Sequence, residues 1–152
     1  MDLKLRAIFG GLKSTNTGTI SYSIIKAEDG REYVGSKYDD VCADYLTKDV
    51  FEELYPNGVN KILRINSIKI KDFSNPQYYD YELIEEAINN SEGLPVLACV
   101  DILESDINHL KEKNLSTYIE CAEKKQKFWE SLGFRKFYSS CCTETSFGMI
   151  KY

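Results

Sequence analysis

Few residues in this chain combine the types and the spacing that catalysis needs. The adjacent carboxylates Glu85 and Glu86 could deprotonate an amine, which is the chemistry of a general base. His109 is the single histidine, so a Ser-His-Asp or Cys-His arrangement would have to use it. It lies in the segment 106–110 beside the polar residues Asp106 and Asn108, as in an exposed loop. Adjacent acidic residues more often solvate a helix face, so these side chains identify no catalytic residue.

The cysteines fit neither a metal site nor a disulfide framework. Their number is odd, and their positions match no metal-ligand spacing: Cys42, Cys99, Cys121, Cys141 and Cys142. The last two are adjacent, which is not a C-x-x-C motif, and a disulfide between neighbours would be strained. We therefore expect free thiols, a reducing cytoplasmic environment and no metal.

Length and charge narrow the class of protein. A chain of 152 residues is expected to form a single domain, here 1–152. Its formal net charge is −5, so a nucleic-acid backbone is not an expected partner. The first residues lack the apolar core of a secretory signal, and no window is apolar enough to span a bilayer. We expect a cytoplasmic domain that binds no membrane.

The first half of the chain predicts strands followed by one helix. Residues 4–9 read as a strand that ends in a loop at Gly10-Gly11. Asp29-Gly30 predicts a hairpin turn between strands 19–26 and 31–34, because both residues tolerate a positive φ. A helix is expected from Asp39 or Asp40 to about Leu54, ended by the Pro-Asn-Gly run at 56–58.

The second half alternates strands and helices. In 61–71 the apolar positions change parity, which predicts a long strand with a bulge near Asn66-Ser67. Residues 77–89 carry a helical apolar stripe, formed by Leu83, Ile84, Ala87 and Ile88. The short apolar run 96–100 predicts a central strand buried on both faces. A polar, partly helical connection at 101–115 follows.

The end of the chain reads as a capped helix and two short strands. Thr117 and Glu120 have the spacing of a capping box, and Gly133 suits the left-handed residue that ends a helix. Ile119, Ala122, Gln126 and Trp129 recur at helical spacing on its inward face. Strands are expected at about 135–138 and 146–150. The chain is therefore predicted to be an α/β domain with a mixed sheet.

The run Phe128-Trp129-Glu130-Ser131-Leu132-Gly133-Phe134 resembles a sequence such as FYEKLGF in the GNAT superfamily of N-acetyltransferases. The order of elements from about residue 61 onward is similar to that family as well. The resemblance implies a GNAT-like fold, in which helices flank a mixed, mostly antiparallel twisted sheet. It also implies acetyl-CoA as acyl donor, with a bulged long strand separating from its neighbour to admit the pantetheine arm.

By this resemblance, the pantetheine would lie along Ile68, Lys69 and Ile70. The pyrophosphate would bind at the start of the following helix, at Gln77, Tyr78, Tyr79, Asp80, Tyr81 and Glu82. The family signature there is R/Q-x-x-G-x-G/A. Gln77 matches its first position, whereas Asp80 and Glu82 stand where small residues let phosphate approach the backbone. Trp129 stands where many family members have a tyrosine that acts as general acid, and an indole N–H is too weak an acid for that role.

Two hypotheses follow. The first is a divergent acyl-CoA-dependent N-acyltransferase that transfers an acetyl group to a small amine or a protein substrate. The second is a catalytically inactive GNAT-like binding or regulatory protein that has lost CoA binding. In that case the acidic segment, which includes Asp72, Asp80, Glu82, Glu85 and Glu86, would recognise a basic protein partner.

Overall fold

The computed structural model of the chain describes residues 2–15, 18–31, 41–91, 93–102, 104–108, 111 and 114–152. Within them, six strands form one mixed sheet in the order β1-β2-β3-β4-β6-β5. The strands are β1 (Leu3–Ser14), β2 (Gly18–Asp29), β3 (Lys61–Ile70), β4 (Val96–Asp101), β5 (Arg135–Phe137) and β6 (Ser146–Lys151). Only β3 and β4 pair in parallel, and every other neighbouring pair is antiparallel. The predicted α/β class with a mixed, mostly antiparallel sheet is confirmed.

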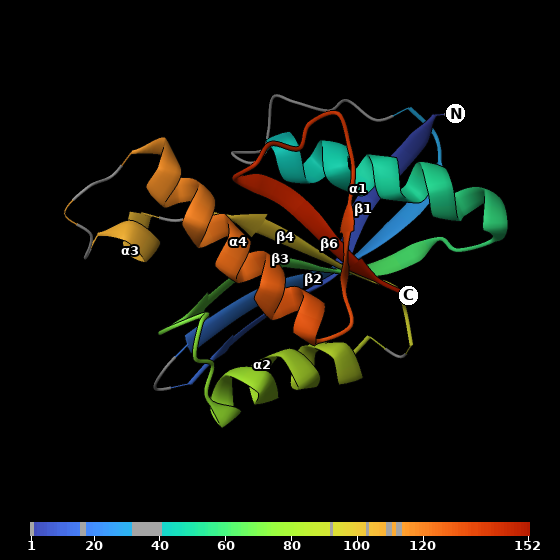
Figure 1. Cartoon of the computed structure of the whole chain (residues 1–152). Helices are drawn as coiled ribbons and strands as arrows, with labels where there is room; N and C mark the ends of the chain where they lie inside the picture. The colour runs from blue at the N-terminus through green and yellow to red at the C-terminus, as the bar shows by residue number, and fades with distance from the viewer. Residues whose placement is uncertain are drawn as a thin grey trace.

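Helices cover both faces of the sheet. Helix α1 (Val41–Leu54), which is followed by a short 3-10 turn at Tyr55–Asn57, lies on one face. Helices α2 (Tyr78–Asn89) and α4 (Leu115–Ser131) lie on the other, and the four-residue α3 (Glu104–Ile107) precedes α4 (Figure 1). Each face has its own apolar core, since the buried residues of α1 cluster apart from those of α2 and α4. Strand β4 is buried on both faces, as its apolar run predicted.

The bulge predicted near Asn66-Ser67 is confirmed. Ser21 of β2 pairs with Ser67, and the next residue, Tyr22, pairs with Ile65, so Asn66 is the extra residue of β3. An extra residue reverses the parity of the side chains that follow it. Ile68 consequently faces the same core as Leu63 and Ile65.

The last long helix ends where predicted but begins earlier. Gly133 adopts φ +89°, and the N–H groups of Gly133 and Phe134 donate to Glu130 O and Trp129 O. The prediction of Thr117 as N-cap is wrong. Asn114 is the N-cap, because its Oδ1 accepts the Thr117 N–H at 3.0 Å and thereby places Thr117 in the first turn.

The amino-terminal half differs most from expectation. Gly10-Gly11 is not a loop, because β1 continues through it to Ser14 and pairs with β2 over its whole length. Strand β1 therefore ends at Ser14, and β2 begins at Gly18. The predicted strand 31–34 lies outside the described residues except for Arg31, which is not in a strand. Asp39 and Asp40, proposed to cap α1, also lie outside them.

Candidate functional site

The parallel strands β3 and β4 separate part-way along their length. Their register runs through Leu63–Val96 and Arg64–Leu97 and ends at Ile65–Ala98, next to the bulge at Asn66. Beyond that point β3 continues to Ile70 and β4 to Asp101 without pairing to each other. Over this stretch the backbone groups on the two facing edges are not bonded to each other.

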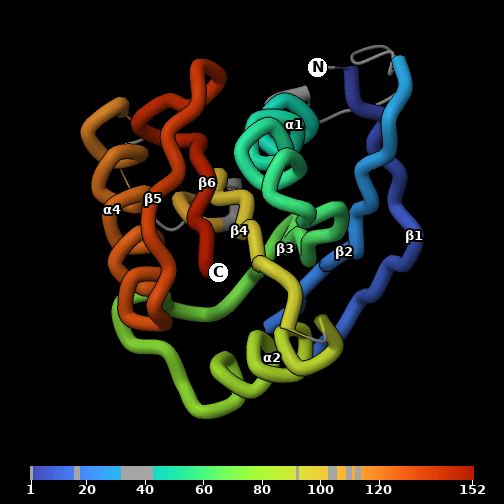
Figure 2. The backbone as a smooth tube through the Cα atoms, turned by 90° about the vertical axis from the view of Figure 1, so that its right-hand side faces the viewer, coloured from blue at the N-terminus to red at the C-terminus, as the bar shows by residue number. Residues whose placement is uncertain are grey.

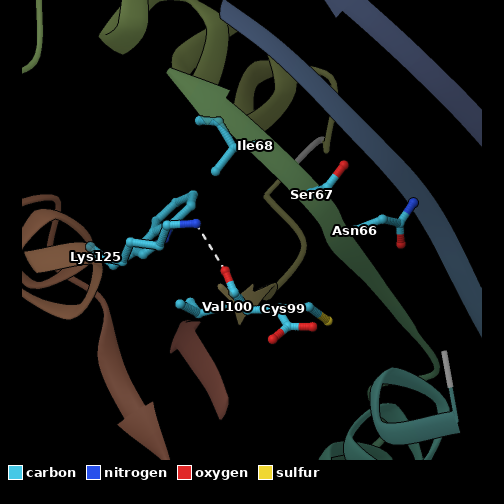
Figure 3. A pocket seen from close by; sticks show the side chains of 8 residues that line it. Asn66, Ser67, Ile68, Cys99, Val100 and Lys125 are labelled. Carbon is cyan, nitrogen blue, oxygen red and sulfur yellow. Dashed lines mark hydrogen bonds between the residues drawn. The ribbon is translucent and has the colours of Figure 1, made fainter. Parts of the chain in front are cut away.

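A pocket of about 160 Å³ lies at this separation (Figure 3). It is lined by Asn66, Ser67, Ile68, Cys99, Val100, Asp101, Lys125 and Trp129. Ile68 and Val100 belong to the core on the α2/α4 face, whereas Cys99 packs against the core on the α1 face. The pocket therefore has lining residues from both faces of the sheet. Its volume is below the roughly 300 Å³ at which drug-sized ligands are usually enclosed, so it suits a small group or the end of a longer ligand.

Lys125 on α4 supplies the buried ammonium of this pocket. Its Nζ donates to the carbonyl oxygen of Asp101 at 2.8 Å and to Asp106 Oδ2 at 2.7 Å. The first of these bonds is the dashed line in Figure 3. The Phe73 ring lies beneath the same ammonium, 4.8 Å from the ring centroid. These contacts hold a buried cation and connect α4 to the end of β4, to α3 and to the loop after β3.

Lys125 was missed by the sequence analysis. Gln126 was assigned to the inward face of α4, but the buried residues of that helix are Ala122, Lys125, Phe128 and Trp129. A signal was present, because residue 125 lies three positions after Ala122 and four before Trp129, on the same helical stripe. Because lysine is rarely buried without a charged or polar partner, a lysine at an inward-facing helix position is assigned to the surface until its partners are known.

Trp129 is buried and lines the pocket. Its ring packs edge-to-face on Phe134, with ring centroids 4.9 Å apart, and on Phe128 at 5.4 Å. The run 128–134 thus positions an indole at the pocket wall. No tyrosine is among the lining residues of this pocket, so its described wall offers no phenol as general acid.

Helix α2 begins at the far end of the loop that follows β3, and a carboxylate already occupies its start. Asp80 Oδ2 accepts the backbone N–H of the N-cap residue Gln77 at 2.7 Å. Asp80 is 1% exposed, and its other oxygen, Oδ1, is buried without a hydrogen-bond partner. A carboxylate is stabilised by a helix amino terminus in the way that a phosphate is. Asp80 therefore competes with any anion for this position.

The other predicted cofactor residues fall into two groups. Ile68 lines the pocket and Ile70 is buried in the core, whereas Lys69 is exposed. Around the start of α2, Tyr81 stacks on Phe128 of α4, and Tyr78, Tyr79 and Glu82 are exposed. The Tyr78 hydroxyl bonds to Glu82, and this bond together with the negative charge raises the pKa of Tyr78. Exposed acidic and phenolic groups thus surround the expected pyrophosphate position.

A polar network borders the pocket on the α1 side. Asn66 Oδ1 accepts from Arg64 Nε at 2.7 Å, and its amide donates to Ser23 Oγ at 2.9 Å. Arg64 also donates to Asp44 Oδ1 at 3.3 Å and to Thr47 Oγ1 at 3.1 Å, both on α1. These bonds fix the side chain of the bulge residue and so hold the shape of the strand separation.

The remaining candidates are not brought together. Glu85 and Glu86 are exposed, and Glu86 pairs with Lys13 of β1. His109 lies outside the described residues.

Burial raises the pKa of the Cys142 thiol, and the same cause raises that of Cys121. No described group of three His, Cys, Asp or Glu side chains is arranged to hold a metal ion. Within the described part of the chain, no helix is both long and apolar enough to cross a bilayer.

Comparison with known proteins adds no relative: no family model, no curated protein and no solved structure matches this chain.

Proposed function

We propose that this chain is a divergent GNAT-like N-acyltransferase that transfers an acetyl group from acetyl-CoA to an amine. The observation that carries the proposal is the separation of the parallel strands β3 and β4 beside a bulge, with a pocket between them. The surrounding order supports it: α2 follows the bulged strand, and α4 ends in Gly133-Phe134 before β5. In the family it resembles, this separation receives the thioester.

The acyl group would lie against the free edge of β3. Leu63 directs its N–H toward β4, since it donates to Pro95 O at 2.9 Å. The bulge gives Ile68 the same orientation as Leu63, so the Ile68 N–H faces the opening. A donor there would stabilise the oxyanion that forms when an unprotonated amine attacks the thioester. One such donor contributes on the order of 3 kcal/mol to transition-state stabilisation.

A second candidate function is favoured by Asp80. Its carboxylate accepts the Gln77 N–H that a pyrophosphate would otherwise use and adds a negative charge at that point. Trp129 cannot protonate a departing thiolate. Both features suit a GNAT-like binding or regulatory protein that has lost CoA. Its acidic surface around α2, formed by Asp72, Glu82, Glu85 and Glu86, would contact a basic protein partner.

Calorimetric titration separates the two functions when acetyl-CoA is compared with S-acetyl-N-acetylcysteamine. The smaller thioester carries the acetyl end without the pyrophosphate. Micromolar binding of acetyl-CoA, with acetylation of a supplied amine, is the result that the acyltransferase proposal expects. The absence of binding of either compound at millimolar concentration overturns it.

The double variant Asp80→Gly, Glu82→Gly tests the loop directly. Because it removes two negative charges and frees the Gln77 N–H, acetyl-CoA should bind it more tightly than the parent chain. Affinity for S-acetyl-N-acetylcysteamine should not change, since that compound has no phosphate. Equal acetyl-CoA affinity in variant and parent would show that this helix start does not meet the pyrophosphate.

A further inference from the structure

The backbone carbonyl of Asp101 faces the opening between β3 and β4. These are the two central strands of the sheet (Figure 2). The Leu63 N–H of β3 donates to Pro95 O at 2.9 Å, so the Pro95 carbonyl points toward β3. Alternate residues of a strand direct their backbone groups to the same side, and Asp101 has the parity of Pro95. Its carbonyl oxygen therefore faces β3 beyond the last paired residues, Ile65 and Ala98.

The ammonium of Lys125 covers that carbonyl and keeps one donor unused. Its Nζ donates to Asp101 O at 2.8 Å and to Asp106 Oδ2 at 2.7 Å. An ammonium has three N–H donors, and the third meets no hydrogen-bond acceptor among the described residues. The Phe73 ring attracts the cation but offers no lone pair. Because Lys125 is buried, the third N–H would be stabilised by an oxygen atom of a ligand in the pocket.

The ion pair presents its positive end to the pocket. Lys125 lines the pocket, whereas Asp106 is not among the lining residues, so the carboxylate of Asp106 stands behind the ammonium. The Asp101 side chain has the parity of Cys99 and therefore lies on the α1 face, away from α4. Its Oδ1 accepts the Ile102 N–H at 2.8 Å. On the α4 side, an oxygen in the pocket thus meets the ammonium before it meets a carboxylate.

A second donor faces the same opening from the other strand. The bulge turns the Ile68 N–H toward β4, as argued above. In Figure 3 the Ile68 side chain points to the side of Lys125, whereas Asn66 and Ser67 point away from it. The opening therefore has the Ile68 N–H on its β3 edge and the Lys125 ammonium on its β4 edge. Two donors on opposite sides suit an oxygen that becomes negatively charged.

We propose that Lys125 is a catalytic residue of the proposed acetyl transfer, in which its ammonium and the Ile68 N–H both donate to the thioester oxygen. This role rests on the proposed function. The amine nitrogen attacks the carbonyl carbon, and the π electrons of C=O move to the oxygen, which becomes the oxyanion. The C=O bond then re-forms and the C–S bond breaks, with its electron pair left on sulfur. The amine nitrogen gives a proton to water, and the released thiolate takes one from water.

Steady-state kinetics of a double variant tests this role. Lys125→Met is combined with Asp106→Leu, so that no buried carboxylate loses its cation. We expect kcat to fall by about 100-fold or more, as for other oxyanion donors. KM for S-acetyl-N-acetylcysteamine should change little, because the donor acts more strongly on the oxyanion than on the neutral carbonyl. Lys127→Met removes an exposed lysine of the same helix and should keep the kcat of the parent chain.

The carbonyl stretching frequency of the bound thioester separates contact from pocket shape. Infrared difference spectra are recorded with S-acetyl-N-acetylcysteamine in the absence of amine. The frequency should be lower in the parent chain and in Lys127→Met than in the double variant, because a hydrogen bond from the ammonium weakens the C=O bond. A double variant with the kcat of the parent overturns the inference. An unchanged frequency overturns it even if kcat falls, since a change of shape alone can lower kcat.

Nitrogen NMR of the parent chain needs no variant and covers a double variant that does not fold. The Nζ resonance of Lys125 should move when S-acetyl-N-acetylcysteamine saturates the chain, whereas that of Lys127 should not. A Lys125 resonance that stays in place overturns the role. Failure of the proposed function gives a different result, because the parent chain itself would then neither bind a thioester nor acetylate an amine, and the role of Lys125 would fall with it.

Discussion

The ammonium of Lys125 on α4 lies 2.7 Å from a carboxylate oxygen of Asp106 on α3, and the two side chains are only 5% and 10% exposed. The same ammonium donates to the carbonyl oxygen of Asp101 at the end of β4. A buried charge that loses its partner keeps its desolvation cost and has no compensating interaction. The pair therefore holds the end of β4, α3 and α4 together at one wall of the pocket.

Lys125→Met should lower the free energy of unfolding by about 3 kcal/mol, because it removes the ammonium that compensates the buried charge of Asp106. The double variant Lys125→Met, Asp106→Leu should recover most of that loss, since both charges are then removed. Urea denaturation of each variant measures the difference. Lys13→Met is the control: it breaks the exposed pair with Glu86 and should change stability little. A Lys125→Met chain as stable as Lys13→Met would contradict the role assigned to the pair.

Much of the fold could be predicted from local pattern. The parity change of the apolar positions in 61–71 predicted the bulge, because one extra residue in a strand reverses the side-chain parity that follows it. Gly133 predicted the end of α4, because the left-handed conformation favours glycine. The helix-then-strand order followed from apolar periodicity. These features depend on a few neighbouring residues, which is why the sequence alone was sufficient.

Features that depend on partners distant in sequence were not predictable. Gly10-Gly11 looks like a loop until β2 is known to pair across it. Lys125 looks exposed until Asp101, Asp106 and Phe73 are placed around it. The pocket itself exists because two strands stop pairing after Ile65 and Ala98, and no local pattern shows where a register ends.

Gly148→Ala should destabilise the chain by about 1 to 3 kcal/mol through overpacking. A Cβ at Gly148 would lie 2.7 Å from a Leu46 methyl carbon and 3.1 Å from a Leu97 methyl carbon, and both leucines are buried. Thermal or urea unfolding measures the effect. Gly10→Ala, where a Cβ meets nothing within 4 Å, is the matched control and should cost little. Adding Leu46→Val to Gly148→Ala should recover part of the loss; no recovery would place the strain elsewhere.

Stability should fall as the pH rises above about 9. Burial raises the pKa of Cys142 and Cys121 above the ordinary thiol value of 9.0. The unfolded chain therefore loses these protons at a lower pH than the folded chain. The stabilisation that the protonated thiols of Cys142 and Cys121 provide is fully present below the thiol pKa of the unfolded chain. It is lost as the pH rises through the thiol pKa of the folded chain. Urea titrations at neutral pH and at about pH 10 measure the decline, although tyrosine ionisation adds to it at the upper end.

Cys142→Ala measures how much of the stability loss at alkaline pH is caused by the Cys142 thiol. It should reduce the difference in unfolding free energy between neutral and alkaline pH, because an alanine has no proton to lose. Alkylation followed by mass spectrometry gives a second measure. At mildly alkaline pH, Cys142 in the folded chain should react more slowly than in urea. Equal rates in both states would contradict a raised pKa in the folded chain.

Trp129→Tyr tests whether the pocket wall can support acyl transfer when a phenol replaces the indole. Trp129 lines the pocket from α4, so a tyrosine at this position presents its hydroxyl near the separation of β3 and β4. If the chain is an acyltransferase, Trp129→Tyr should raise kcat above that of Trp129→Phe. The expected gain is on the order of tenfold or more, because only the tyrosine can protonate the departing thiolate.

Both substitutions remove part of a buried ring, and so their losses of stability should be similar. Steady-state kinetics with acetyl-CoA and an amine, beside urea denaturation of both variants, separates the chemical effect from the structural one. Equal kcat in the two variants would mean that thiolate departure needs no acid at this position.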